Sequence, residues 1–424
     1  MNVKQLTTGV TFCAHKTKQF KTAVVSVNII APLGDKASEN ALLVHLLART
    51  NKDNPTITEM NRTLAGLYGA MIVPKIQKCG EAQVLTLSLV SIDDRFSLDG
   101  KAVLEKGIKL LCECIFRPDI TPEGFREENL EREKRLLIEK IESEKDDKRI
   151  YALERMTEEM CDRELYGISK FGEKEKIETL TGKELLSAWK NLIFRCPVQI
   201  NVTGNFDEEK TEKIFFEIFS KLGRKKEDIA EIHTEFITEA YESKTVTEKQ
   251  KLKQGKLVIG MRAGMTYDYD NFPALKVMTA IFGSGTFSKL FMNVREKMSL
   301  CYYCSANLNR MKGIITVQSG VETENTQKAL DAIRNELDEM RKGNFSDEVI
   351  GNAKLSLKET YKTVFDNVIM IDGWFTSQIS SGTFRTPEEF ISDIEKVSRE
   401  EIILAANCVT EDTVYILEGE KEEE

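Results

Sequence analysis

The stretch TAVVSVNIIAPLG at 22–34, followed by ENALLVHLLART at 39–50, decides the fold. The first stretch is rich in Val and Ile and predicts a buried strand, and the second has apolar residues on successive helical turns and predicts a helix. The same order returns about 230 residues later, where KLVIGMRAGM at 256–265 precedes PALKVMTAIFGSG at 273–285. Two copies of one strand–helix unit predict two similar halves, because a solenoid needs at least three repeats.

Both copies continue with further elements in the same order. The first adds strands at 66–74 and 82–92, a helix at 100–116 and a final strand at 198–206. The second adds strands at 299–308 and 313–321, a helix at 325–343 and a final strand at 413–419. Strands separated by helices around one-sided sheets predict an α+β fold, in which each half is an antiparallel-type sheet covered by helices.

A charged stretch separates the two copies. Residues 224–255 contain few apolar side chains, so we expect them to link an N-terminal half at 1–223 to a C-terminal half at 256–424. The length of 424 residues also favours two domains over one.

The composition is that of an ordinary globular protein. With 41% apolar and 30% charged residues, the chain has enough large apolar side chains to form packed cores. The formal net charge of -9 gives a surface that repels phosphate on average. It argues against general nucleic-acid binding and against docking on anionic membranes.

No part of the sequence has the pattern of an export signal or a membrane span. The first residues, MNVKQLTTGVTFCAHKTKQ, lack the basic start and apolar run of a signal peptide, and no apolar run reaches about 18 residues. We therefore expect a cytoplasmic protein with nine reduced cysteines. Cys301 and Cys304 form a CxxC pair, but residues three apart on a strand point to opposite faces, so we expect no shared metal or disulfide.

Several longer strings, in their order and spacing, resemble one family of zinc peptidases. They are GVTFCAHKTKQFKTAVVSVNIIAPLG at 9–34, EREKRLLIEKIESEKDDKRIYALERMTEEM at 131–160, VTGNFDEEKTEKIFFEIFSKLG at 202–223 and FGSGTFSKLFMNVREKMSLCYY at 282–303. Together they resemble the insulinase/pitrilysin-type M16 peptidases, the family that includes the mitochondrial processing peptidase. The resemblance covers nearly the whole chain and implies the LuxS/MPP-like metallohydrolase fold, with two halves forming a clamshell.

Active members of that family have an HxxEH motif on the first helix, where two His bind zinc and the Glu activates a bound water. His45 is the histidine at the matching place. If His45 is the second His of the motif, the other two positions hold Ala41 and Val44. If it is the first, they hold Ala48 and Arg49, so both registers lose the base and one ligand.

The third family ligand, a Glu on a later helix, is also replaced. The string EKRLLIEKIE aligns Lys140 with that position and leaves Glu139 about 100° around the helix. A protonated lysine cannot ligate zinc. The replacements imply that this chain has no zinc site, no cofactor and no catalytic residue, and that zinc is expected only in an active partner.

One pair of family residues is present in the second half. Active members and some inactive partners use an Arg and a Tyr seven residues apart to bind the peptide carbonyl, and Arg295 and Tyr302 match that pattern. A guanidinium and a phenol can both donate to a developing oxyanion. The alternative is that Arg295 pairs with an acidic neighbour on its helix and that Tyr302 packs against Tyr303.

The resemblance therefore implies a catalytically inactive M16-like subunit. We expect it to bind peptide, to form a heterodimer with an active zinc-bearing paralogue, or to self-associate. Two alternatives stay open: an active zinc peptidase that uses His45 with Glu139 or Glu142, and a stand-alone binding or scaffold protein.

Overall fold

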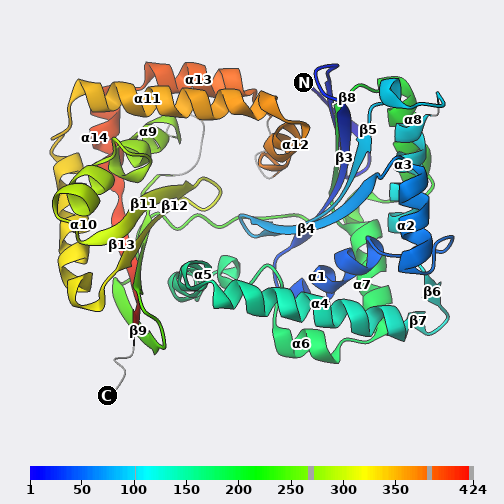
Figure 1. The fold of residues 1–424 in the computed structure, drawn as a ribbon, viewed down its shortest axis with the longest axis horizontal. Helices are drawn as coiled ribbons and strands as arrows, with labels where there is room; N and C mark the ends of the chain where they lie inside the picture. The colour runs from blue at the N-terminus through cyan, green and yellow to red at the C-terminus, as the bar shows by residue number, and fades with distance from the viewer. Residues whose placement is uncertain (101, 266–271, 380–383, 420–424) are drawn as a thin grey trace. The chain divides into compact units, whose positions relative to one another are not determined.

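A central sheet with helices on both faces forms the core of each half of the protein (Figure 1). The computed structural model describes residues 1–100, 102–265, 272–379 and 384–419. They divide into two compact units. Unit 1 comprises Met1–Glu142, Ile168–His233 and Val364–Phe384, and unit 2 comprises Ser143–Gly167, Thr234–Thr363 and Arg385–Glu424.

The sheet of unit 1 has six strands in the order β1-β2-β8-β3-β5-β4. Its strands are β1 (Asn2–Thr7), β2 (Val10–Lys16), β3 (Thr22–Pro32), β4 (Met71–Cys79), β5 (Ala82–Ile92) and β8 (Val198–Gly204). The helices of this part of the chain are α1 (Ala37–Leu47), α2 (Ile57–Gly66), α3 (Val103–Phe116), α4 (Glu127–Asp146), α6 (Lys174–Thr179), α7 (Gly182–Arg195), α8 (Glu208–Ser220) and α12 (Val368–Thr376). A short hairpin, β6 (Ile120–Thr121) and β7 (Gly124–Phe125), precedes α4.

The sheet of unit 2 has five strands in the order β11-β12-β10-β13-β9. Its strands are β9 (Lys244–Gln250), β10 (Gly255–Arg262), β11 (Cys301–Asn309), β12 (Ile314–Val321) and β13 (Thr410–Gly419). Its helices are α5 (Lys148–Met160), α9 (Phe272–Gly283), a π-helix at Leu290–Lys297, α10 (Thr326–Arg341), α11 (Asp347–Lys362), α13 (Pro387–Lys396) and α14 (Arg399–Cys408).

The two strand orders are the same pattern, which confirms the prediction of two homologous α+β halves. Reading β4, β5, β3, β8 and β2 against β11, β12, β10, β13 and β9 gives one arrangement, to which unit 1 adds β1. Each sheet is antiparallel except for one pair: β2 runs parallel to β8, and β9 runs parallel to β13. The last part of the predicted linker at 224–255 thus forms strand β9.

Side chains of both faces of each sheet are buried. In β10, Leu257, Ile259 and Met261 lie in the core beneath α9 and α10, whereas Val258 lies in a second cluster with side chains of α5. Successive side chains of a strand alternate between faces. A strand covered on both faces is apolar along most of its length, which explains the continuous runs of Val and Ile in the sequence.

The helix on the second face of each sheet comes from the other half of the sequence. Helix α5, in the N-terminal half at 1–223, belongs to unit 2, and α12, in the C-terminal half at 256–424, belongs to unit 1. The boundaries of the two compact units therefore differ from those of the two sequence halves, because each half contributes one helix to the other unit. Gly260 shows how closely α5 approaches its sheet, because an added Cβ would lie 2.5 Å from the sulfurs of Met156 and Met160.

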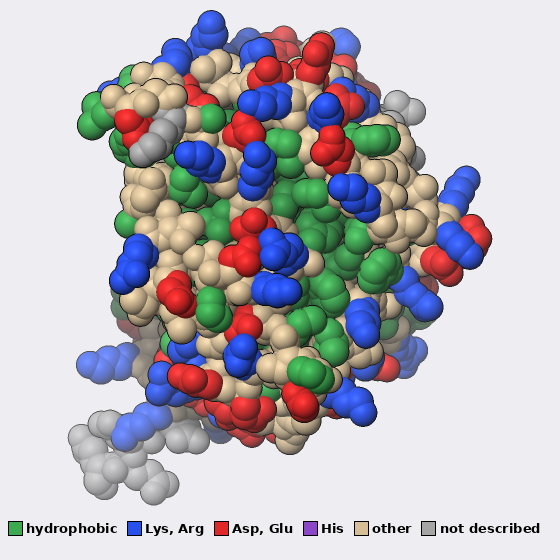
Figure 2. Space-filling view, turned by 90° about the vertical axis from the view of Figure 1, so that its right-hand side faces the viewer, with side chains coloured by type: hydrophobic (Ala, Val, Ile, Leu, Met, Phe, Trp, Pro, Cys, Tyr) green, Lys and Arg blue, Asp and Glu red, His purple; other side chains and the backbone are tan. Residues whose placement is uncertain are grey.

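The outer helices of unit 1 expose some apolar side chains. Figure 2 shows hydrophobic side chains in the middle of the face that lies on the right in Figure 1, surrounded by charged ones. Phe216 of α8 is 47% exposed.

None of the helices within the described ranges combines the length and the apolarity that crossing a membrane requires.

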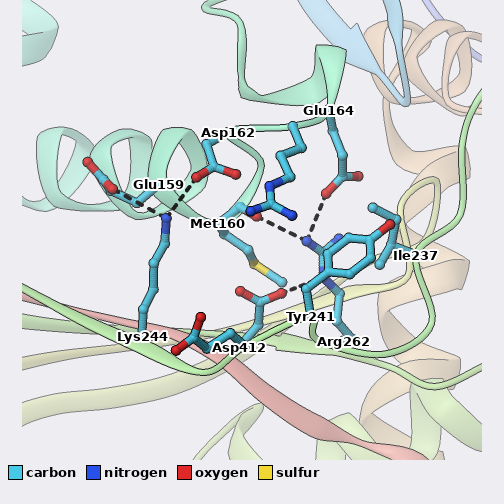
Figure 3. A pocket seen from close by; sticks show the side chains of 11 residues that line it. Glu159, Met160, Asp162, Glu164, Ile237, Tyr241, Lys244, Arg262 and Asp412 are labelled. Atoms are coloured by element: carbon cyan, nitrogen blue, oxygen red, sulfur yellow. Dashed lines mark hydrogen bonds and ion pairs between the residues drawn. The ribbon is translucent and has the colours of Figure 1, made fainter.

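A buried ionic cluster connects α5 and the residues after it to the sheet of unit 2 (Figure 3). The Arg262 side chain is 1% exposed, and its guanidinium donates to Asp412 at 2.8 Å and to Glu164 at 2.7 Å. It also donates to the backbone carbonyl of Met160 at 3.1 Å, and Lys312 lies 2.7 Å from the second oxygen of Glu164. Burial raises the pKa of Glu164, but the hydrogen bonds from Arg262 and Lys312 outweigh that effect and lower it.

Removing this guanidinium should destabilise the protein strongly. Arg262→Leu leaves the carboxylates of Asp412 and Glu164 buried with one cation fewer, and breaking such a buried network costs about 3–5 kcal/mol. Chemical unfolding followed by circular dichroism measures the change. The matched control is Arg334→Leu, which removes a partly exposed pair with Glu411 and should cost less than about 1 kcal/mol. Equal losses in the two variants would contradict the importance of the buried cluster.

Helix α12 packs on a polar face of the unit 1 sheet. Asp372 is 8% exposed and accepts a hydrogen bond from Ser26 at 2.9 Å, while Asn201 donates to the hydroxyl of Thr376 at 3.1 Å. Burial raises the pKa of Asp372 to about 6, although the hydrogen bond from Ser26 lowers it. The folded state therefore holds a proton on Asp372 over a pH range in which the unfolded chain has lost it.

The raised pKa of Asp372 predicts a pH-dependent stability difference. Between pH 4 and pH 6 the folded chain binds more protons at this site, so its contribution to stability falls as the pH rises. Asp372→Asn removes that loss and should gain up to about 3 kcal/mol relative to wild type between pH 4 and pH 8. Unfolding free energies of both proteins across this range give the difference. A difference that does not change with pH would rule out a raised pKa at Asp372.

Candidate functional site

Helix α1, which holds the histidine of the degenerate motif, is buried on nearly all sides. Ala41 is fully buried, Val44 is 2% exposed, and His45 is half-buried with its Nε2 atom shielded from solvent. Nε2 of His45 has no hydrogen-bond partner among the described residues. Burial, followed by the positive charges of Lys140 and Arg49, lowers the pKa of His45 to about 4. The imidazole is therefore neutral near pH 7.

The residues around His45 do not fit a zinc ion. An unpartnered imidazole nitrogen could ligate a metal, but Ala41 and Val44 offer no donor atoms and Lys140 contributes a positive charge. The Lys140 ammonium lies 5.4 Å from the ring centroid of Phe171. Among the residues that the structure describes, no three His, Cys, Asp or Glu side chains are grouped so that they could hold a metal ion.

The other residues that a zinc site could use have different partners. Arg49 lies 3.8 Å from the buried carboxylate of Glu133 on α4, so in the second register the position of the second His holds one side of an ion pair. Glu139 lies 3.7 Å from Arg135 on the exposed side of α4, and Glu142 pairs with Lys174. These contacts place Glu139 and Glu142 in surface ion pairs.

Arg295 and Tyr302 lie next to each other in unit 2. Arg295 is on the π-helix at Leu290–Lys297, and its Nε donates to the backbone carbonyl of Tyr302 at 2.9 Å. The same guanidinium pairs with Glu296 at 2.9 Å and lies 4.6 Å from the ring centroid of Phe291. The sequence spacing of seven residues thus corresponds to a direct contact.

The phenol of Tyr302 is exposed and does not pack against Tyr303. Tyr302 is 60% exposed, and its hydroxyl donates to Glu322 at 3.1 Å, a contact that raises the pKa of the phenol. The ring of Tyr303 lies beneath the Arg149 guanidinium at 4.7 Å. Of the two contacts that the structural alternative predicts, the acidic partner of Arg295 is therefore observed, whereas the described contacts of Tyr302 and Tyr303 are with other residues.

A β-bulge at the start of β11 corrects the expectation for Cys301 and Cys304. Cys301 is opposite Val321, Tyr303 is opposite Gly320, and Tyr302 between them has no partner in the ladder. One extra residue reverses the alternation of faces, so the two cysteines lie on the same face, and Cys301 packs against the core cluster that contains Cys304. The prediction of opposite faces was wrong because a bulge has no signal in the sequence.

Sequence similarity assigns the family. A model described as "Peptidase M16 inactive domain" matches residues 179–357. The relative "Probable inactive metalloprotease YmfF" of Bacillus subtilis (strain 168) is 31% identical over 412 residues, which cover 97% of this chain and 96% of the relative.

The chain belongs to the M16 peptidase family.

Solved structures show the same M16 fold. A conserved protein from Enterococcus faecalis V583 superposes with a TM-score of 0.90 at 28% identity, covering 100% of this chain and 99% of that one. A peptidase M16 inactive domain from Pseudomonas fluorescens gives a TM-score of 0.80 at 17% identity, covering 100% of this chain and 99% of that one. The chain is thus an M16 homologue similar in sequence to a relative described as inactive.

Introducing the HxxEH motif and the third carboxylate of active M16 members should create a zinc site. We expect no stoichiometric zinc in wild type, and one zinc per chain in the triple variant Ala41→His, Val44→Glu and Lys140→Glu, because that variant supplies the HxxEH motif and the third carboxylate. Elemental analysis after dialysis measures the zinc. The matched control keeps Lys140 and changes only the two α1 residues.

Two results would contradict this interpretation of the site. One is a zinc ion that wild type binds stoichiometrically and whose removal by chelators lowers the melting temperature. The other is a triple variant that folds, as judged by circular dichroism, but binds no more zinc than the control.

Proposed function

We propose that this chain is a non-catalytic M16 subunit that binds an extended peptide and pairs with an active, zinc-bearing paralogue. The observation that supports the proposal most directly is the contact between Arg295 and Tyr302. Positions of the family's zinc ligands and base hold Ala41, Val44 and Lys140, whereas the two peptide-contacting positions hold the family's residue types. A chain that keeps only the contacts to substrate needs another chain for the chemistry.

The position of Tyr302 in the sheet suits the binding of an extended chain. β11 is an edge strand of its sheet, and Tyr302 is its second residue. Edge strands present unpaired backbone groups with which an extended peptide can form ladder hydrogen bonds. An exposed phenol and a guanidinium at one end of that edge could donate to a carbonyl of the bound peptide.

The acidic partners of these two donors would not prevent binding. Arg295 pairs with Glu296, and Tyr302 donates to Glu322, both at the protein surface. Exposed contacts of this kind contribute little, so exchanging them for a peptide carbonyl costs little. The guanidinium stays charged at any physiological pH.

The proposal is tested by co-expressing this chain with an M16 paralogue that has an intact HxxEH motif. Native mass spectrometry should show a complex of the two chains, and the complex should cleave an unstructured peptide library. Arg295→Ala removes a donor to the developing oxyanion and should lower kcat on the order of 10²-fold, with Tyr302→Phe lowering it less. Lys297→Ala, two residues along the same helix, is the matched control and should retain full activity.

The other outcomes separate the alternatives. Full cleavage by both variants with the complex intact would show that Arg295 and Tyr302 are only structural. Zinc-dependent cleavage by this chain alone would support an active peptidase with other ligands. Failure to form any complex or to bind peptide would favour a stand-alone scaffold.

A further inference from the structure

The bulge at the start of β11 creates a thiol pair that the regular strand would not have. Cys301 and Cys304 share one face of the strand, where Cys301 lies opposite Val321 and Cys304 lies opposite Ser319 of the neighbouring strand β12. Ser319 is fully buried and donates to the backbone carbonyl of Tyr303 at 3.0 Å, which fixes the pairing of the two strands here. Cys301 packs against the core cluster that contains Cys304, so the two thiols are neighbours on one face of the sheet.

The two thiols differ in exposure and in charge environment. Cys301 is half-buried at the first position of the strand, whereas Cys304 is 5% exposed in the core of unit 2. The neighbouring Cys304 thiol lowers the pKa of Cys301 to about 7 against the opposing effect of burial, and Ser319 and the Arg295 guanidinium make smaller contributions that also lower it. The pKa of Cys304 is raised well above its ordinary value, because that thiol donates to Cys301 and is buried.

We propose that Cys301 and Cys304 form a redox-active dithiol that exchanges with small-molecule disulfides to give a reversible intramolecular disulfide. A partly exposed thiolate near a cation, with a second thiol beside it on the same face, is an arrangement that favours thiol–disulfide exchange. Other cysteines of the described residues lack this combination. Cys112 and Cys114 are both buried on α3, and burial raises the pKa of both thiols.

The exchange takes two steps and needs no group beyond the added disulfide. The Cys301 thiolate attacks one sulfur of the small disulfide, which forms a mixed disulfide and releases one thiolate. The Cys304 thiol then loses its proton and attacks the sulfur of Cys301, which forms the intramolecular bond and releases the second thiolate. The dithiol loses two electrons and two protons, and the small disulfide is reduced to two thiols.

Forming the bond requires the start of β11 to move. A disulfide has an S–S length of about 2.05 Å and needs its Cα atoms within about 7 Å, so the two thiols must come closer. Cys301 can move because it begins the strand and follows Ser299, whose φ of 52° marks a tight turn. Tyr302 lies between the two cysteines, so oxidation would also reposition its exposed phenol.

The test treats the native full-length chain with oxidised glutathione and then blocks free thiols by alkylation. Lys297 and Arg310 flank the pair, so trypsin releases MSLCYYCSANLNR at 298–310, which contains both cysteines and no other. We expect this peptide to be unalkylated and two hydrogens lighter than its reduced form. Reduction by dithiothreitol before alkylation should restore two alkylated cysteines.

Single substitutions identify the role of each thiol. Cys304→Ser should stop at a stable mixed disulfide on Cys301, and Cys301→Ser should leave Cys304 reduced. Arg295→Ala should slow the first step several-fold because it removes a cation beside the attacking thiolate. Cys408→Ser, which changes a half-buried cysteine elsewhere in unit 2, is the control and should behave as wild type.

Two results would overturn the proposal. One is a wild-type peptide in which Cys301 carries glutathione while Cys304 remains free to be alkylated, because the second step would then not occur. The other is a Cys301 that reacts no faster than Cys408. Both results are independent of whether the chain binds a peptide.

Discussion

The structure depends on one constraint: both faces of each central sheet must be covered by helices. The first face of each sheet is covered by helices close to it in sequence, such as α1 and α3 in unit 1 or α9 and α10 in unit 2. The second face has no such neighbour and is covered by α12 or α5, each from the other half of the chain. Without these helices, a sheet with buried-type residues on both faces would expose one of them to water.

The two exchanged helices use different chemistry to hold their positions. Helix α5 packs through Met156 and Met160 against Gly260, and the Arg262 cluster fixes its end. Helix α12 instead accepts hydrogen bonds at Asp372 and Thr376 from the side chains of Ser26 and Asn201 in the sheet. An apolar contact tolerates small shifts in register, whereas buried polar groups are costly unless their partners are placed correctly. These polar contacts therefore fix the position of α12 on the sheet more strictly than the burial of apolar area alone would.

The apolar residues at the positions expected for the M16 zinc ligands on α1 are compatible with the fold for a simple reason. Helix α1 is buried on nearly all sides, so a charged base and two metal-binding imidazoles on it would have to be stabilised by the metal or by other partners. Ala41 and Val44 remove that requirement and let α1 pack as an ordinary core helix. Active sites are commonly less stable than the same positions filled by apolar residues, so apolar side chains at these two positions favour a more stable α1.

The sequence was sufficient to predict the repeated elements, and it failed where tertiary contacts decide the outcome. The strand predicted at 82–92 coincides with β5, and the helix predicted at 100–116 contains α3, because both have strong apolar periodicity. The sequence predicts a linker where strand β9 forms, because the alternating Lys, Thr and Glu of β9 do not indicate that it pairs with β13. The allocation of α5 to unit 2 was equally hidden, because an amphipathic pattern shows that a helix has a partner but not which one.

The bulge in β11 had the largest consequence among the features that the sequence did not reveal. On a regular strand Cys304 would share a face with Tyr302. The bulge shifts the alternation by one residue, so Cys304 shares a face with Cys301 instead. The bulge places Cys301 beside Cys304 and leaves the backbone of Tyr302 without a ladder partner, where Arg295 reaches its carbonyl. Bulges occur preferentially at sheet edges and beside functional sites, because they redirect side chains without changing the fold. One backbone irregularity on an edge strand thus accounts for both the peptide-contact candidate and the thiol pair.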